Sequence, residues 1–440
     1  MGISYTEAVR LVEREAEGHK LSQTQTCSLF NACDRVAGKT IYSPISTPQY
    51  DTSAMDGFAL SSMATETATA ESPVTFEVIA TTTAGDRPHS PDDDLRDGIP
   101  PCVEIMTGAP FPLGRDADMF DCCVPVEDVV LSENKFSNRR YISVSKPARP
   151  RQHRRLAGGD FRKRDLIIKA GETIQSQYIM AMASVGVIEV QVVRRPRVAV
   201  FSTGCEVVSQ DNDRSHPFMI NDANGPYLTS MLRGWGVDVD FRGVVRDDRE
   251  AMEEAIVAAL EEKYNMIITS GAVSAGRCDI IPSLVKRIGG RTVFHKVAVK
   301  PGHPILFSML PRGAGESAFF GLPGNPVAAA ACLRFFVHRY LRTLQGQTEE
   351  EPRRASLRLS RPGEEHLSQC DATKRQVLAF RPEPDIFRPA ILSKCGQEVW
   401  IIDDHSPGKT RPFLQANSWV LIPSGVSEVQ QGSRVTVFPC

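Results

Sequence analysis

The segment Met266–Asp279 constrains the fold of this chain most strongly. The apolar run Met266-Ile-Ile268 leads into Thr-Ser-Gly-Ala-Val-Ser-Ala-Gly-Arg-Cys-Asp279, a loop of small residues that ends in an acid. An open α/β sheet builds an anion site in this way, because successive backbone N–H groups can point at one phosphate while Asp279 holds a counter-cation. A plain strand-to-helix turn has a similar composition, so the segment alone leaves both interpretations open.

Strands and helices alternate from Arg197 onward. Strands are expected over 198–201, 237–241, 266–268 and 319–320, with helices near 222–234, 249–263 and up to about 345. This spacing predicts a mostly parallel, doubly wound sheet. Ligands of such sheets lie beyond the carboxyl ends of the strands. The loops expected at those ends are Ser202–Glu206, Ser270–Asp279 and Gly321–Pro326.

The remainder of the 440 residues predicts further domains, since this length corresponds to roughly three. An amphipathic helix is expected over Thr6–Glu17. Short β-like runs broken by Pro, Gly and Asp over 43–147 indicate a β-rich insert, and the same texture over 355–440 indicates a small β domain. A basic run covers Lys146–Arg164, and a helix is expected over Gln175–Val187.

Composition excludes several classes of function. The net charge of −2 gives no overall attraction to nucleic acid or anionic membranes. No apolar run reaches the roughly eighteen residues that a membrane span needs, and the first residues do not resemble a secretion signal. Eleven cysteines without a Cys-x-x-Cys pair are typical of reduced thiols rather than a zinc cluster. We therefore expect a cytoplasmic protein.

Nine separated segments of the chain form a pattern when they are taken together and in their order along the sequence. They are Ser43–Pro48, Asp51–Phe58, Ile105–Pro110, Gly158–Asp160, Phe201–Glu206, Arg246–Asp248, Ser270–Asp279, Lys300–Gly302 and Gly321–Val327. Together they resemble the molybdopterin molybdenumtransferase family, which includes bacterial MoeA and the E domain of gephyrin-like proteins. The matches cover nearly the whole chain in the order of that family.

The resemblance implies an α/β multidomain architecture. A doubly wound MogA-like α/β domain would cover 196–347, with a β-rich insert domain over 43–147. An elongated linking domain, together with the N-terminal helix, would be built from 1–42 and 148–195. A small C-terminal β-barrel domain would cover 352–440.

The resemblance also implies the activity. Molybdate would be inserted into the dithiolene of adenylylated molybdopterin, with hydrolysis of the adenylate, release of AMP and dependence on Mg²⁺ or another divalent cation. The family forms elongated homodimers whose sites lie between the α/β domain of one subunit and the insert of the other. A molybdopterin adenylyltransferase would act in trans, and neither nucleic acid nor membrane is an expected partner.

Site residues follow from the same matches. The candidate catalytic residues are Asp56, Thr107, Asp160, Glu206, Asp248 and Asp279, and the candidate metal ligands are Glu206 and Asp279, whose hard oxygens suit Mg²⁺. The candidate substrate-binding residues are Ser202, Thr203, Gly204, Asp222, Ser270, Gly271, Ser274, Gly276, Lys300, Pro323 and Pro326. The basic residues around Asp160 (Arg154, Arg155, Arg162 and Lys163) are candidates for attracting the anionic pterin, although such runs are more often solvated faces.

Several positions depart from the pattern of the family. Ala272 stands in place of a second glycine, which would cost about 1 kcal/mol if that position needs a positive φ. Cys205 stands where an Asp or Asn commonly precedes the glutamate, Gly225 occupies the usual arginine position, and His303 follows Pro-Gly where bacterial members often have Lys. The Ser-Ser pair of the family is not found in the C-terminal domain, where Thr410–Phe413 lies nearby. Two alternatives therefore stay open: a catalytically degenerate paralogue that acts as a dimeric scaffold or cofactor-binding protein, and the preceding adenylyl transfer.

Overall fold

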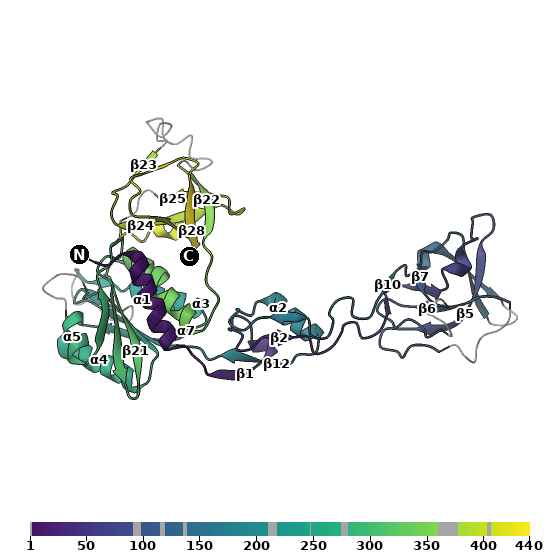
Figure 1. The fold of residues 1–440 in the computed structure, drawn as a ribbon, viewed down its shortest axis with the longest axis horizontal. Coiled ribbons are helices and arrows are strands. Elements are labelled where there is room, and N and C mark those ends of the chain that lie inside the picture. The colour runs from purple at the N-terminus through teal and green to yellow at the C-terminus, as the bar shows by residue number, and fades with distance from the viewer. Residues whose placement is uncertain are drawn as a thin grey trace.

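The computed structural model describes residues 2–90, 98–114, 119–134, 139–209, 218–246, 248–273, 280–359, 377–402 and 406–440. The chain is elongated. A β-rich domain lies at one end, a small linking domain lies in the middle, and an α/β domain with a second β domain on top of it lies at the other end (Figure 1). Among the described residues, no helix has the length and apolarity that crossing a membrane requires.

The α/β domain contains a six-stranded sheet in the order β16-β13-β17-β21-β20-β18. β13, β16, β17 and β21 are mutually parallel, whereas β20 pairs antiparallel with β21 and with β18. The strands are β13 (Arg197–Thr203), β16 (Asp238–Val245), β17 (Met266–Ser270), β18 (Arg291–His295), β20 (Leu306–Arg312) and β21 (Gly315–Leu322). The predicted parallel strands are confirmed, while β18 and the β20–β21 hairpin were not anticipated.

Helices cover both faces of this sheet, as expected of a doubly wound fold. They are α1 (Tyr5–Gly18), α3 (Asn224–Gly234), α4 (Arg249–Glu261), α5 (Ile281–Arg287), α6 (Pro326–Cys332) and α7 (His338–Leu344), with a π-helical turn at Leu333–Val337 between the last two. One face packs on α1, α3, α6 and α7, and the other on α4 and α5. Alternate residues of β13 and β17 enter the two cores, because side chains alternate along a strand: Val200 and Ile268 face one core, Ala199 and Ile267 the other.

The N-terminal helix α1 belongs to the core of the α/β domain. Ser4 caps the helix by accepting a hydrogen bond from the Glu7 N–H, and Ala8, Val12 and Ala16 form its buried stripe. The stripe repeats every four residues, so it follows one face of the helix. The chain therefore leaves the α/β domain after α1 and returns to it at β13.

The linking domain carries two two-stranded pairs and one helix. These elements are β1 (Thr24–Ser28), η1 (Leu29–Asn31), β2 (Ile41–Tyr42), β11 (Leu166–Ile168), α2 (Ser176–Ser184) and β12 (Glu189–Val193). β1 pairs with β12 and β2 with β11, so the outgoing and returning chains run side by side. Its small core includes Leu29, Ile174, Met182 and Val192.

The insert at the far end is built around a six-stranded sheet in the order β7-β4-β6-β5-β9-β8. Its elements are β4 (Gly57–Leu60), η2 (Met63–Thr65), β5 (Val74–Thr82), β6 (Pro101–Ile105), β7 (Cys122–Pro125), η3 (Val126–Asp128), β8 (Val129–Asn134) and β9 (Arg139–Val144). A short pair of β3 (Thr52–Ser53) with β10 (Arg154–Arg155) joins it to the linking domain. The β-rich character expected for this region is confirmed.

The C-terminal domain is a closed five-stranded barrel. The strands follow the order β24-β25-β22-β28-β26, and β26 pairs with β24 to close the ring. They are β22 (Arg353–Arg358), β24 (Asp385–Leu392), β25 (Glu398–Ile401), β26 (Ser418–Ile422) and β28 (Arg434–Pro439), accompanied by β19 (Val299–Lys300), β23 (Val377–Ala379), β27 (Glu428–Gln430) and η6 (Pro412–Gln415). Closure removes the exposed edges that an open sheet would present.

Candidate functional site

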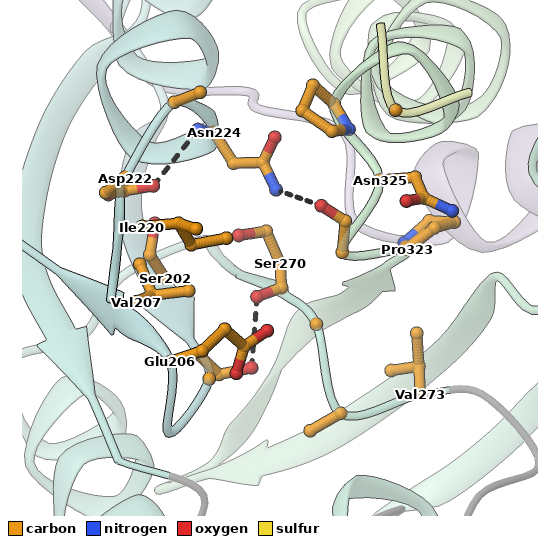
Figure 2. A pocket seen from close by; sticks show the side chains of 18 of the residues that line it. Ser202, Glu206, Val207, Ile220, Asp222, Asn224, Ser270, Val273, Pro323 and Asn325 are labelled. Carbon is orange, nitrogen blue, oxygen red and sulfur yellow. Dashed lines mark hydrogen bonds between the residues drawn. The ribbon is translucent and has the colours of Figure 1, made fainter. Parts of the chain in front are cut away.

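A pocket of about 500 Å³ lies beyond the carboxyl ends of β13, β17 and β21 (Figure 2). Ser202, Ser270 and Leu322 lie opposite one another in the parallel register, so the loops that follow these strands emerge at the same edge. Nine of the predicted residues line the pocket: Ser202, Thr203, Gly204, Glu206, Asp222, Ser270, Gly271, Pro323 and Pro326. The sheet thus brings together residues from four separate segments of the sequence.

Two hydrogen bonds hold the strand-end loops against one another. The Thr203 hydroxyl donates to the Ser270 carbonyl oxygen at 3.0 Å, and the Gly271 N–H donates to the Leu322 carbonyl oxygen at 2.9 Å. Both bonds are made by residues at or directly after the ends of strands. The floor of the pocket is therefore tied to the sheet.

The turn at Gly271 and Ala272 has an unusual backbone. Gly271 has a φ of 103°, and a Cβ atom there would lie 2.5 Å from the Thr203 Oγ1 and 2.8 Å from the Thr203 carbonyl oxygen. Ala272 has a φ of 54°, in the left-handed region that alanine seldom adopts. Position 272 therefore has the positive φ at which alanine is less stable than glycine, so Ala272 carries that conformational cost.

Asp222 organises the wall formed by the start of α3. Its Oδ1 accepts hydrogen bonds from the N–H groups of Asn224 and Gly225 at 3.0 and 3.1 Å. The Asn224 amide in turn donates to the Gly324 carbonyl oxygen at 2.8 Å, which joins this wall to the loop before α6 (Figure 2). Helix α3 and the Gly324 loop are therefore linked across the pocket.

Two polar oxygens of the pocket are buried without a hydrogen-bond partner among the described residues. They are the Ser202 Oγ and the Asp222 Oδ2. Buried polar atoms are nearly always satisfied in folded proteins, by protein, water or ligand. Both oxygens are therefore candidates for a hydrogen bond to water or to a ligand.

Glu206 supplies an exposed carboxylate to the pocket. It lies in the turn between β13 and β14 (Val207–Val208), where its backbone carbonyl accepts a hydrogen bond from the Ile220 N–H at 2.8 Å. The described residues contain no group of three or more His, Cys, Asp or Glu side chains that could hold a metal ion. The predicted Ser274, Gly276 and Asp279 lie outside the described residues. The oxygen donors of Glu206 are of the type that Mg²⁺ prefers.

Asp56 and Thr107 form a separate pair in the insert. The Asp56 Oδ1 accepts hydrogen bonds from the Thr107 N–H at 2.6 Å and from the Thr107 hydroxyl at 2.9 Å. These two donors, the N–H first, lower the pKa of Asp56 below its usual value. At Gly57 a Cβ atom would lie 2.1 Å from the Val124 carbonyl oxygen, so only glycine allows this approach. Asp56 is therefore an exposed, ionised carboxylate that Thr107 holds in position.

This pair and the pocket do not meet within one chain. The insert lies at the far end of the elongated molecule from the α/β domain (Figure 1). Three other predicted residues also lie outside the pocket lining. Asp160 is exposed and donates its N–H to the Thr47 carbonyl oxygen, Asp248 caps α4 by accepting from the Ala251 N–H at 2.9 Å, and Lys300 is exposed at the end of β19. Their catalytic or binding roles remain predictions.

Some lining residues escaped the sequence analysis. Asn325 lies inside the matched segment Gly321–Val327, and Asn224 lies in the helix expected near 222–234, but neither is among the predicted site residues. Gly408 comes from the C-terminal barrel domain, whose loop docks on the start of α6 through a hydrogen bond from the Val327 N–H to the Pro407 carbonyl oxygen at 2.9 Å. No local pattern signals such a contribution, because it depends on how the barrel packs.

The structure accounts for another departure from the family pattern. At Gly225 a Cβ atom would lie 2.3 Å from the Phe241 ring and 2.5 Å from the Asp222 Oδ2. The Phe241 ring therefore occupies the space that a side chain at position 225 would need. An arginine there would require both neighbours to move.

Comparisons with known proteins agree with this geometry. A family model described as the MoeA N-terminal region (domain I and II) matches residues 3–186, and one described as a probable molybdopterin binding domain matches residues 199–343. The molybdopterin molybdenumtransferase of Synechococcus elongatus is 30% identical over 437 residues and 99% of each chain, and that of Staphylococcus aureus is 28% identical over 414 residues, 94% of this chain and 90% of the other.

Solved structures give the same result. A molybdopterin biosynthesis MoeA protein from Pyrococcus horikosii aligns with a TM-score of 0.74 and 27% identity, covering 100% of this chain and 99% of that chain. A second MoeA structure, from Pyrococcus horikoshii OT3, shares the fold with a TM-score of 0.77 at 20% identity, over 100% of both chains. The relatives match over nearly their full length, so the chain belongs to the molybdopterin molybdenumtransferase family.

Proposed function

We propose that this chain inserts molybdate into adenylylated molybdopterin, with hydrolysis of the adenylate and release of AMP. The observation that carries the proposal is the pocket at the carboxyl ends of β13, β17 and β21, which gathers nine of the predicted catalytic and binding residues. Its volume of about 500 Å³ is in the range of small-molecule sites. All of the pocket lining except Gly408 lies within residues 199–343, the segment matched by the probable molybdopterin binding domain.

The pocket residues have distinct roles in this proposal. The strand-end turn at Gly271 brings the backbone close to the ligand, as a phosphate site requires. The Ser202 hydroxyl donates a hydrogen bond to an anionic oxygen, and the Asp222 Oδ2 accepts one from a ligand N–H or O–H. Each contact satisfies an oxygen that is buried without a partner among the described residues.

Mg²⁺ is the divalent cation that we expect at this pocket. Glu206 would hold it, together with Asp279, through hard carboxylate oxygens. When bound, the ion would neutralise phosphate charge. Other divalent cations with the same preference for oxygen would be accepted at such a site.

Asp56 and Thr107 are proposed to come from the insert of a second copy of the chain. This proposal is supported by the distance of Asp56 and Thr107 from the pocket of their own subunit (Figure 1). Within one chain, the insert pair and the pocket therefore cannot act on the same ligand. Exposed apolar side chains on the linking domain favour contact between copies: Phe30 is 96% exposed and Ile188 is 77% exposed. The Leu29 N–H donates to the Ile188 carbonyl oxygen at 2.8 Å, so these two side chains belong to adjacent segments.

Sedimentation velocity tests the homodimer. We expect a dimer at micromolar concentrations, and Phe30→Ser should shift it toward the monomer with a parallel loss of activity. A stable wild-type monomer with full activity would contradict the two-subunit site.

The activity is tested with purified protein, adenylylated molybdopterin, Mg²⁺ and molybdate, assayed for AMP and active cofactor. Asp56→Asn should slow AMP release by about 100-fold, the scale of general acid–base contributions. Asp86→Asn is a matched control, because Asp86 also lies exposed in the insert and accepts hydrogen bonds from the N–H and hydroxyl of one threonine, Thr83. AMP release that is equally slow in wild type and Asp56→Asn would favour the scaffold alternative.

A further inference from the structure

A second cleft lies at the opposite edge of the α/β sheet from the pocket. It has a volume of about 910 Å³. One wall consists of residues 20–23 together with Arg194, Arg195 and Arg197, where the chain crosses between the α/β and linking domains. The other wall consists of Leu260 and Glu261 at the end of α4, Lys263 and Asn265 between α4 and β17, Arg312 at the end of β20, and Gly313 and Ala314 in the turn to β21. Because Arg197 begins β13 and Asn265 precedes β17, this is the amino edge of the sheet.

The described lining of this cleft is strongly basic. Its six cationic side chains face a single acid, Glu261. The cations are Lys20, Arg194, Arg195, Arg197, Lys263 and Arg312. The whole chain has a net charge of −2, so this concentration of positive charge is local.

Two of the arginines have a structural role that needs no ligand. The Arg197 Nη1 donates to the Glu262 carbonyl oxygen at 2.7 Å, and its guanidinium lies 4.4 Å from the centre of the Tyr264 ring. The Arg312 Nη1 donates to the carbonyl oxygens of Lys263 and Tyr264 at 2.9 and 2.8 Å. Arg197 therefore caps the carboxyl end of α4, where carbonyl groups lack helical partners, whereas Arg312 holds the segment between α4 and β17.

The remaining cations include three that are available for a ligand. Arg194, Arg195 and Lys263 are exposed, and none of them pairs with a carboxylate of the described residues. The Arg194 Nη1 donates to the amide oxygen of Gln23 at 3.2 Å, and this neutral acceptor does not compensate the charge of the guanidinium. Lys20, by contrast, pairs with Glu17 at 3.0 Å. The cleft therefore carries at least three uncompensated positive charges.

The shape and chemistry of the cleft decide the class of ligand. Its described lining contains no aromatic side chain, so it has no stacking surface for a nucleobase or a pterin. Its volume exceeds what a single phosphate needs and suits several residues of an extended peptide. We propose that this cleft binds an acidic peptide segment of a partner protein, with Arg194, Arg195 and Lys263 facing its carboxylates.

Exposed charges of this kind mainly affect how fast a partner protein associates. They raise the association rate of an oppositely charged partner and are screened by salt. Binding at the cleft should therefore be fast and sensitive to ionic strength. It should also be independent of chemistry at the pocket, which lies at the other edge of the sheet.

Fluorescence anisotropy with a labelled hexaglutamate peptide tests the proposal, with labelled hexaglutamine as the uncharged probe. We expect hexaglutamate to bind the full-length wild type at low salt and to be released by added NaCl. Arg194→Gln/Arg195→Gln should weaken binding by about tenfold or more. The matched control is Lys39→Gln/Lys169→Gln, which makes the same change in net charge at exposed positions of the linking domain outside the cleft. It should bind as the wild type does.

Other outcomes would overturn the proposal. These are the absence of hexaglutamate binding, an equal loss in the two double variants, or displacement of the peptide by tripolyphosphate at equal or lower concentration, which would indicate a small-anion site. AMP release by Arg194→Gln/Arg195→Gln should match that of the wild type, which also shows that the variant is folded. A parallel loss of AMP release would contradict a site separate from the pocket.

Discussion

Gly271→Ala should destabilise the α/β domain and distort the pocket. The residue has a φ of 103°, and forcing alanine into such a conformation costs about 1–3 kcal/mol. The new Cβ would also lie 2.5 Å from the Thr203 Oγ1 and 2.8 Å from the Thr203 carbonyl oxygen. The carbonyl belongs to β13 and cannot rotate away, so overpacking adds about 1–3 kcal/mol.

Gly243→Ala separates these two contributions. Gly243 lies in β16 of the same sheet with a φ of 93°, and a Cβ atom there has nothing within 4 Å. It should therefore cost only the conformational strain. We expect Gly271→Ala to be less stable than Gly243→Ala by about 2 kcal/mol, or roughly 4–8 °C in the calorimetric midpoint of a domain of this size. Equal midpoints would refute the assigned clash with Thr203.

Three further perturbations follow from the contacts of single residues. Thr107→Val removes the hydroxyl that donates to Asp56, so the pKa of Asp56 should rise and the acidic limb of the AMP-release profile should move to higher pH; an unmoved limb would argue against Asp56 acting as the carboxylate. Burial lowers the pKa of His338 to about 2, so stability should fall as the pH drops below the unfolded value near 6.5. Urea unfolding at pH 7.5 and 5 should show the wild type losing about 2 kcal/mol more than His338→Gln, and parallel losses would contradict a neutral histidine. Arg334→Met leaves Glu350 without its buried partner at 2.6 Å, which should cost about 3 kcal/mol by calorimetry; an unchanged midpoint would show that the pair contributes nothing.

Strand-to-helix patterns predicted the part of the fold that carries the pocket. β13 and β17 are short apolar runs that end in small or polar residues, and their loops are local features of the sequence. The parallel order of these strands then placed Ser202 and Ser270 side by side. Local patterns suffice here because each loop directly follows its own strand.

Other features depend on long-range packing and gave no local signal. β20 and β18 break the strand–helix alternation, because β20 reverses direction in a hairpin with β21 and includes Pro311 near its end. The barrel closes only through the pairing of β24 with β26. Gly408 reaches the pocket because the barrel packs on α6, so its role could not be predicted from neighbouring residues.

The substitution at Ala272 shows how far a local argument can reach. The motif predicts that alanine carries a cost at this position if its φ is positive, and the φ of 54° meets that condition. The same reasoning could not foresee Gly225 in α3, where the deciding neighbour is Phe241, a residue of β16. A motif can thus predict part of the backbone conformation, whereas the space available to a side chain depends on the tertiary fold.

Mixing two inactive variants tests most directly that catalysis uses the pocket of one subunit and the insert of another. Asp56→Asn and Glu206→Gln should each release little AMP from adenylylated molybdopterin in the presence of Mg²⁺ and molybdate. After subunit exchange, half of the dimers would be mixed, and each would contain one intact site. We therefore predict recovery of roughly a quarter of the wild-type rate. A mixture that stays as inactive as its two components, although exchange is verified, would contradict the shared site.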